Sequence, residues 1–166
     1  MGSGYKFKCS KCRNQYSVST GTGFIFPDIY TDMVSDIKEG KYGDEWKELM
    51  LSEEFVAVDA ERNLYVCKEC GYWTVDSDLS LYAPNDPDLI RNKQYGIKTV
   101  EEWGEVPYVM GGDLRDDYHL LKKWIHKCEK CGSVMHKGTE EEKENLPCPK
   151  CGGKPKTEST MYFMWD

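Results

Sequence analysis

Eight cysteines are the residues of this sequence best suited to chemistry, and none lies outside a Cys-x-x-Cys pair. Glycine follows three of the pairs, at Gly71, Gly132 and Gly152, whereas Arg13 follows the first. A turn there can aim two thiolates and several backbone N–H groups at one point, and it favours positive φ, which glycine adopts at little cost. The pattern predicts four metal-binding knuckles, the first of them looser because of Arg13. The pairs are Cys9/Cys12, Cys67/Cys70, Cys128/Cys131 and Cys148/Cys151.

Four knuckles can combine into two four-thiol sites in three ways. Between Cys131 and Cys148 lie 16 residues, which fits the spacing C-x₂-C-x₁₅₋₂₀-C-x₂-C of a zinc site. We therefore expect site 2 to consist of Cys128, Cys131, Cys148 and Cys151. By elimination, site 1 consists of Cys9, Cys12, Cys67 and Cys70. Cross-pairing of the two halves is the alternative.

Four thiolates in a tetrahedron suit either zinc or iron. The stretches YVCKECGYWTVD and LPCPKCGG each resemble a rubredoxin knuckle. In rubredoxins, however, the CxxCGY half comes first and the CPxCG half follows, whereas Cys67/Cys70 is expected to take its partner from upstream. Ser133-Val134 also stands where an aromatic residue is expected. We therefore predict two structural Zn²⁺ ions with closed coordination, with iron as the alternative.

Other roles for these residues are less favoured. A disulfide framework suits a secreted chain, but no export signal follows Met1. Thioredoxin-like redox chemistry needs one such pair beside a βαβ unit. Because eight thiols already fill two sites, His119, His126 and His136 are expected to lie on hairpins or at the surface.

The elements that must position the first two knuckles follow from the pattern of residues. Alternation over Tyr5–Lys8 and Gln15–Ser19 predicts a hairpin around the first knuckle. A buried Phe24-Ile25-Phe26 is expected next.

Two helices are expected after this segment. The first should begin at Pro27-Asp28, bury Ile29, Met33 and Ile37, and end at Gly40. A second helix should bury Trp46, Leu49 and Met50. Phe55–Asp59 and Asn63–Cys67 are expected to pair as strands, followed by a strand over Tyr72–Val75.

The later part of the chain is rich in turns before it reaches the last two knuckles. Thr99 and Glu102 form a capping-box pattern that predicts a short helix ending at Gly104. Strands are expected over Val106–Met110, Tyr118–His126 and Thr160–Asp166, the last closing the second zinc site. Thr139–Asn145 is expected to form a loop or a short helix.

We thus expect an α+β chain of three parts. Residues 1–82 should form a zinc ribbon with a two-helix insertion at about 20–55. Residues 83–117 should form a linker with a short helix and strand, and residues 118–166 a second ribbon.

Charge is distributed unevenly along the 166 residues, whose net charge is −7. Residues 22–121 carry 9 basic and 22 acidic residues, whereas the segments before and after them have net charges of +4 and +2. An acidic middle disfavours a nucleic-acid complex that wraps the chain. The basic ends, interleaved with Tyr5, Phe7, Tyr16 and Trp124, nevertheless offer an alternative nucleic-acid surface. Its basic residues are Lys6, Lys8, Lys11, Arg13, Lys122, Lys123, Lys127, Lys130, Lys150, Lys154 and Lys156.

The whole layout resembles small uncharacterised bacterial proteins with two zinc ribbons. The shared features are a knuckle near Met1, the Gly-x-Gly-Phe-x-Phe-Pro element at Gly21–Pro27, an inserted helical pair at 28–52, Tyr82–Pro84, and a terminal Met164–Asp166. The resemblance implies a zinc-binding fold in a bacterial cytoplasm and transfers no catalytic residue.

No motif of a catalytic site accompanies the cysteines. The sequence has no Gly-x-Ser-x-Gly, no His-Glu-x-x-His and no Walker loop. No apolar run approaches the length that spans a membrane. We therefore expect a cytoplasmic, non-catalytic adaptor that docks another protein. The alternatives are nucleic-acid binding and rubredoxin-like electron transfer through iron.

Overall fold

The structure is a computed structural model, which describes residues 2–156 and 160–165. The chain divides into two compact units. The thiol unit consists of Met1–Phe24, Arg62–Ser77 and Ile125–Asp166, and the helical unit of Ile25–Glu61 and Asp78–Trp124. The chain thus passes between the units four times. This division differs from the expected sequence of residues 1–82, 83–117 and 118–166, because strands far apart in the chain associate within each unit.

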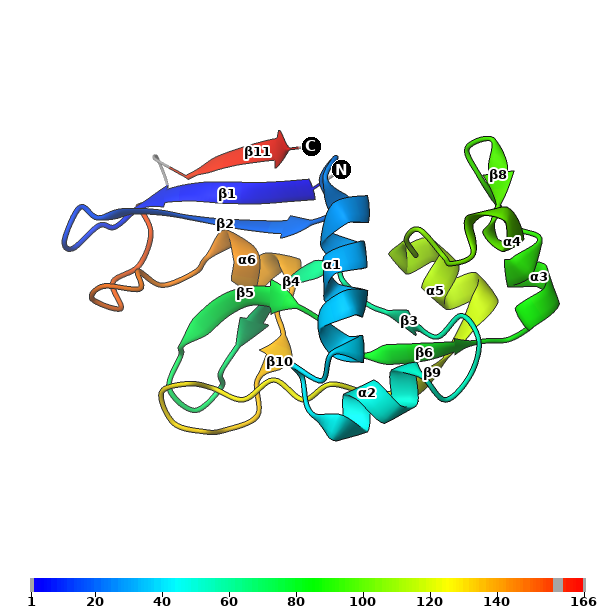
Figure 1. Cartoon of the computed structure of the whole chain (residues 1–166). Helices are drawn as coiled ribbons and strands as arrows, with labels where there is room; N and C mark the ends of the chain where they lie inside the picture. The colour runs from blue at the N-terminus through cyan, green and yellow to red at the C-terminus, as the bar shows by residue number, and fades with distance from the viewer. Residues whose placement is uncertain (1, 157–159, 166) are drawn as a thin grey trace. The chain divides into compact units, whose positions relative to one another are not determined.

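The thiol unit is built on an antiparallel sheet of six strands (Figure 1). Two hairpins contribute four of them, and each hairpin holds a knuckle at its tip. The first strand of each hairpin also pairs with a later strand on its other edge, which gives the orders β2-β1-β11 and β5-β4-β10. The two groups meet where Gly21 pairs with Arg62. The strands are β1 (Gly2–Lys8), β2 (Gln15–Gly21), β4 (Arg62–Val66), β5 (Trp73–Ser77), β10 (His136–Lys137) and β11 (Met161–Trp165).

Small apolar clusters hold this sheet together. Phe7, Val18, Leu64 and Leu146 are buried in one cluster, and the helix α6 (Glu140–Glu144) lies just before Leu146 in the chain. A second cluster surrounds Tyr65 beside the knuckle thiols. The thiol unit therefore has little apolar core of its own, and small cores of this kind commonly depend on bound metal for stability.

Strand β11 corrects one expectation about the thiol unit. The strand exists as predicted, but it pairs with β1 rather than closing a separate C-terminal ribbon. Its rings cover the two glycines of β1: a Cβ on Gly2 would lie 2.2 Å from the Trp165 ring, and one on Gly4 2.7 Å from the Phe163 ring. Asp166, the last residue of the predicted strand, lies outside the described residues.

The helical unit combines five helices with two small antiparallel sheets among its described residues. One sheet has the order β3-β6-β9, and the other is the hairpin β7-β8. The elements are α1 (Phe26–Lys38), α2 (Asp44–Met50), β3 (Ala57–Val58), β6 (Leu81–Pro84), α3 (Pro87–Arg91), β7 (Gln94–Tyr95), β8 (Lys98–Thr99), α4 (Val100–Trp103), α5 (Gly111–Asp117) and β9 (Tyr118–Lys122).

Helices α1 and α2 form where the apolar spacing predicts them, with small differences in the buried face. Helix α1 buries Phe26, Tyr30, Met33 and Ile37, whereas the predicted Ile29 is only partly buried. Phe24 and Ile25 are exposed, contrary to expectation. In α2, Trp46 is buried and donates its indole N–H to the carbonyl oxygen of Leu79 at 2.8 Å.

Three strand expectations are wrong in this unit. Strand β3 pairs with β6 instead of β4, which belongs to the thiol unit. Residues 106–110 form no strand, and Gly111-Gly112 begins helix α5. Strand β9, expected in the second ribbon, pairs with β6. These pairings depend on contacts between distant segments, which alternation within one segment does not specify.

The expected linker is also largely folded. Between β6 and α5 the chain forms α3, the β7-β8 hairpin and α4, and α4 has the predicted capping box of Thr99 and Glu102. Lys93 contributes to this folding, since its ammonium group lies 2.7 Å from Asp113 and 2.8 Å from Asp117 of α5.

The two units differ sharply in charge. The thiol unit has 13 basic and 9 acidic residues, a net charge of +4, whereas the helical unit has 9 basic and 20 acidic residues, a net charge of −11. Across the described residues, none of the helices has the length and apolar character needed to cross a lipid bilayer.

Candidate metal centres

All four knuckles have the same backbone geometry. In each, the N–H of the first cysteine donates to the carbonyl oxygen five residues later at 2.8 Å, and the N–H four residues later donates back to the cysteine carbonyl. The residue that donates back has positive φ in every case: 61° at Arg13, 69° at Gly71, 74° at Gly132 and 68° at Gly152. The first knuckle is therefore formed like the others. Only its returning bond, 3.2 Å against 2.8–3.0 Å, is longer.

The knuckles bring the eight thiols together in two groups. Cluster A consists of Cys9, Cys12, Cys148 and Cys151, and cluster B of Cys67, Cys70, Cys128 and Cys131. In each knuckle the first cysteine is buried, and the second is exposed or, at Cys151, partly exposed. The thiols thus lie at the edge of the thiol unit.

This grouping corrects the predicted sites. Cys9 and Cys12 do not meet Cys67 and Cys70, and Cys128 and Cys131 do not meet Cys148 and Cys151. The spacing of 16 residues fits a local site, but β10 and α6 occupy that interval. The strand after the third knuckle pairs with β4, and the strand after the fourth pairs with β1. Each later knuckle is thereby delivered to a different hairpin, and the sites are nested in the sequence.

Both clusters have dimensions that suit a tetrahedral metal ion. In cluster A the Sγ atoms of Cys9 and Cys151 are 3.5 Å apart, and those of Cys12 and Cys148 are 3.7 Å apart. In cluster B the Cys67–Cys131 and Cys70–Cys128 separations are both 3.5 Å. A tetrahedron with Zn–S bonds of about 2.3 Å has S···S edges of about 3.8 Å. A disulfide needs about 2.05 Å, and all eight cysteines are free.

A glycine allows the close approach of the backbone at cluster A. A Cβ on Gly153 would lie 2.9 Å from the Cys9 sulfur and 3.3 Å from the Cys151 sulfur. A side chain there would press on two thiols of the set. Gly153 therefore allows the backbone to pass close to the sulfurs of cluster A, in addition to its place in the turn.

Backbone N–H groups point at the sulfurs and change the acidity of individual thiols. The hydrogen bond from the Cys12 N–H lowers the pKa of the Cys9 thiol to about 6. The side chain of Ser133 similarly lowers the pKa of Cys131 to about 6. The Tyr72 N–H favours the thiolate of Cys70, but burial and the neighbouring thiols outweigh it and raise that pKa to about 12. The four thiols of a cluster influence one another's protonation, and a bound metal cation displaces the remaining protons.

The histidines lie outside the two clusters. His126 is buried, and its ring stacks on Tyr65 with centroids 3.6 Å apart. His136 contacts Glu142 through Nε2 at 2.9 Å, and His119 contacts Asn85 through Nδ1 at 3.0 Å.

The two clusters have different electrostatic surroundings, which the linear sequence does not reveal. The segments around cluster A, 5–16 and 146–156, contain seven exposed basic residues and no acidic one. The corresponding segments around cluster B, 66–73 and 125–134, contain three basic and two acidic residues. The basic charge of the two chain ends therefore converges at cluster A. Its members are Lys6, Lys8, Lys11, Arg13, Lys150, Lys154 and Lys156.

Comparison of the chain with known protein families, curated proteins and solved structures gives no match.

Proposed function

We propose that clusters A and B each bind one structural Zn²⁺ ion and that each forms a zinc ribbon with its three strands. The nested four-thiol geometry supports this proposal most directly. Four thiolates close the coordination of zinc and leave no position for substrate, which is typical of structural sites. Zinc binding would then supply the stability that the small apolar clusters of the thiol unit lack.

Zinc is preferred to iron, although one of the sequence arguments for zinc, the order of the two halves of a site, does not hold in the structure. Cys67/Cys70 precedes its partner Cys128/Cys131, so the order of the halves no longer counts against iron at cluster B. Neither cluster, however, combines the two rubredoxin-like stretches. YVCKECGYWTVD contributes to cluster B, and LPCPKCGG contributes to cluster A. In each cluster, the rubredoxin-like stretch is therefore combined with a second knuckle that does not resemble a rubredoxin knuckle.

Elemental analysis together with an absorption spectrum tests the metal assignment. We expect two zinc ions per chain and a colourless protein. A chelator should lower the melting temperature, and zinc should restore it. Stoichiometric iron with visible thiolate-to-iron absorption would overturn the zinc assignment and favour the electron-transfer alternative.

For the cellular role we propose a non-catalytic interaction module, in which zinc organises the thiol unit and the acidic helical unit contacts a partner protein. The net charge of −11 on the helical unit supports a basic partner surface, because opposite charge speeds and orients association. Affinity capture from a native lysate tests this role. We expect a stoichiometric partner whose capture weakens at high salt, and repeated recovery of the chain alone would contradict it.

A second candidate function rests on the charge around cluster A. Seven exposed cations without acids in the same segments could contact a phosphate backbone. Titration with a fluorescent single-stranded oligonucleotide at several salt concentrations tests this candidate. Lys11→Gln/Lys150→Gln removes two cations and should reduce the slope of log K against log salt by about 1.4, since each phosphate contact on a single strand contributes about 0.7. The matched control Lys68→Gln/Lys127→Gln at cluster B should not. Equal slopes for all three proteins would exclude this surface.

A further inference from the structure

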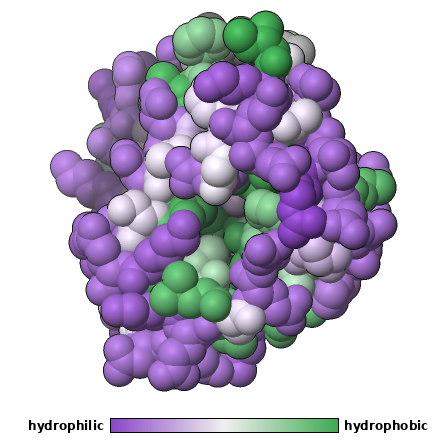
Figure 2. All heavy atoms as spheres, turned by 45° about the vertical axis from the view of Figure 1, so that its right-hand side comes forward, coloured by the Kyte–Doolittle hydropathy of each residue, from purple (hydrophilic) through white to green (hydrophobic). Residues whose placement is uncertain are grey.

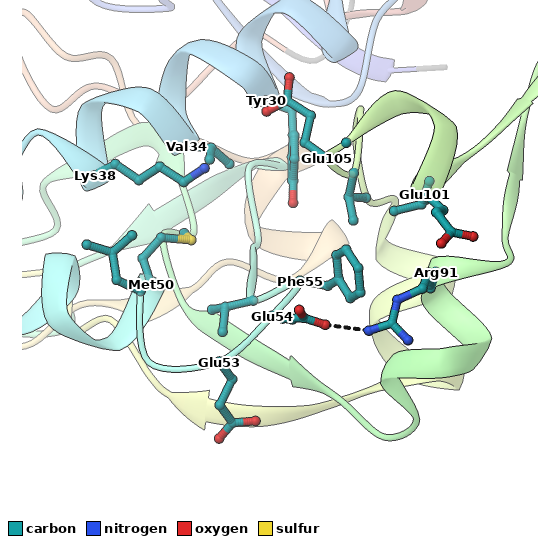
Figure 3. A pocket seen from close by; sticks show the side chains of 15 residues that line it. Tyr30, Val34, Lys38, Met50, Glu53, Glu54, Phe55, Arg91, Glu101 and Glu105 are labelled. Atoms are coloured by element: carbon teal, nitrogen blue, oxygen red, sulfur yellow. Dashed lines mark hydrogen bonds and ion pairs between the residues drawn. The ribbon is translucent and has the colours of Figure 1, made fainter.

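The helical unit contains a cavity of about 430 Å³ that the metal sites do not explain. This volume lies in the range of ligand-binding pockets. Its apolar lining comes from α1, from the end of α2 and the chain after it, and from the segment after α4; the residues include Tyr30, Val34, Met50, Phe55, Val56 and Val106. Figure 3 shows Tyr30 and Phe55 facing the same space. On the face shown in Figure 2, hydrophobic side chains lie at the base of a hollow that hydrophilic side chains surround.

One wall of this cavity is held in an unusual conformation. Phe55 has a φ of 60°, a region that bulky residues rarely adopt. Arg91 holds the ring, with its guanidinium 5.8 Å from the ring centroid, and it also contacts the carboxylate of Glu54 at 2.6 Å. The cavity is thus built by a cross-link between the segment after α2 and helix α3. Strained residues of this kind are found at ligand clamps.

The rim of the cavity is predominantly acidic. Arg91 is already paired with the carboxylates of Glu54 and Asp88. Glu53, Glu101 and Glu105 are exposed and have no ion-pair partner among the residues the structure describes. Figure 3 shows these three carboxylates at the periphery of the cavity and Lys38 on its α1 side. An apolar centre with carboxylates around it complements an apolar group flanked by cations.

We propose that this cavity docks a short segment of a partner protein in which bulky apolar side chains are flanked by lysine or arginine. The apolar side chains enter between Tyr30, Val34 and Phe55, and the basic ones reach Glu53, Glu101 and Glu105. This inference deepens the proposed interaction role and assigns its contact to one site. It does not depend on which metal the clusters bind.

Three synthetic tetrapeptides test the inference on the full zinc-loaded chain. Acetyl-Lys-Leu-Leu-Lys-amide carries both features, acetyl-Lys-Ser-Ser-Lys-amide lacks the apolar side chains, and acetyl-Glu-Leu-Leu-Glu-amide reverses the charge. Binding is followed by ¹H–¹⁵N NMR. We expect the first peptide to shift the amide signals of Val34, Phe55 and Val106 and to bind at least about tenfold more tightly than either control peptide.

Two variants with the same change in net charge separate a local contact from general attraction. Glu101→Gln/Glu105→Gln should weaken the first peptide about five- to tenfold, because each rim pair contributes a modest electrostatic term. Asp32→Asn/Asp116→Asn changes exposed carboxylates of the same unit outside the cavity lining and should have little effect.

The possible results discriminate between the inference and the proposed function. Equal affinity for all three peptides, tighter binding of the anionic peptide, or signals that shift mainly in the thiol unit would overturn the inference. If a lysate partner is captured equally by the wild type and Glu101→Gln/Glu105→Gln, the interaction role stands and this cavity is not its site. If the peptide binds as expected and no partner is captured, the cavity stands and the interaction role fails.

Discussion

At the scale of single residues, the knuckles show how little the chain needs for a metal-binding turn. The same two hydrogen bonds recur in all four, and the residue with positive φ is a glycine in three. Arg13 adopts that conformation despite its side chain, at a cost of about 1–2 kcal/mol. The first knuckle is therefore formed correctly and strained, where the sequence predicted a looser turn.

Replacing Arg13 should consequently stabilise the protein. We expect Arg13→Gly to raise the free energy of unfolding by about 0.5–1 kcal/mol, since relief of the left-handed strain outweighs the greater freedom of glycine in the unfolded chain. Urea unfolding of the zinc-loaded protein measures this. Arg13→Ala is the control, because it removes the charge and keeps the Cβ; an equal gain from both variants would mean that charge, not strain, is responsible.

Gly4 illustrates a different requirement, the close packing of a strand. A Cβ at this position would lie 2.2 Å from the carbonyl oxygen of Val18 and 2.7 Å from the Phe163 ring. We expect Gly4→Ala to destabilise the protein by about 2 kcal/mol, because β2 or β11 must shift to accommodate it. In the control Gly112→Ala, the nearest atom lies 3.9 Å away, and thermal melting should show no loss. A neutral Gly4→Ala would show that β2 and β11 do not pack on β1 as described.

At the scale of elements, local signals predicted helices α1 and α2 but not α3 or α5, and they predicted strand partners poorly. The apolar spacing placed α1 and α2, and one capping-box pattern placed α4; for Thr139–Asn145 the sequence left a loop and a short helix open, and the structure has helix α6. These signals act within about one helical turn. A strand such as β3 or β9 has the same local pattern whichever sheet it joins, so its partner is decided by the surrounding chain.

Helix α6 provides a pH-dependent prediction. The Thr139 N–H lowers the pKa of Glu142, and His136 lowers it further. A lowered folded pKa means that the contribution is present above the unfolded value of 4.5 and is lost as the pH falls through the folded value. We expect Glu142→Ala to cost about 1 kcal/mol at pH 7, because the capping box is lost.

Unfolding of the wild type and Glu142→Ala is compared at each pH in the same concentration of zinc, because protonation of the thiolates at low pH releases zinc from both proteins alike. The difference between wild type and Glu142→Ala should shrink as the pH falls below 4.5. Glu142→Gln keeps the capping geometry without the charge, so it should lose less unfolding free energy than Glu142→Ala, and the difference between these two variants should not change with pH. A difference between wild type and Glu142→Ala that is constant with pH would mean that the carboxylate charge does not contribute.

At the scale of the whole molecule, the nested pairing of knuckles makes a prediction that no other pairing shares. Cys12→Ser/Cys70→Ser removes one ligand from each cluster, so both zinc ions should be lost after dialysis against a chelator. Cys12→Ser/Cys151→Ser removes two ligands from cluster A alone, so one zinc ion should remain. Elemental analysis counts the retained ions. The pairing predicted from spacing would give the opposite result for the two variants.

The sequence by itself determined the four knuckles, the two principal helices and the uneven charge. Each depends on residues a few positions apart or on composition alone. It could not determine which knuckles meet, because Cys9 and Cys151 are separated by 142 positions and their meeting depends on β11 pairing with β1. The same holds for the basic cluster around cluster A and for the acidic cavity of the helical unit. Only the tertiary structure decided these, because sheet pairing and side-chain packing select among segments that are locally equivalent.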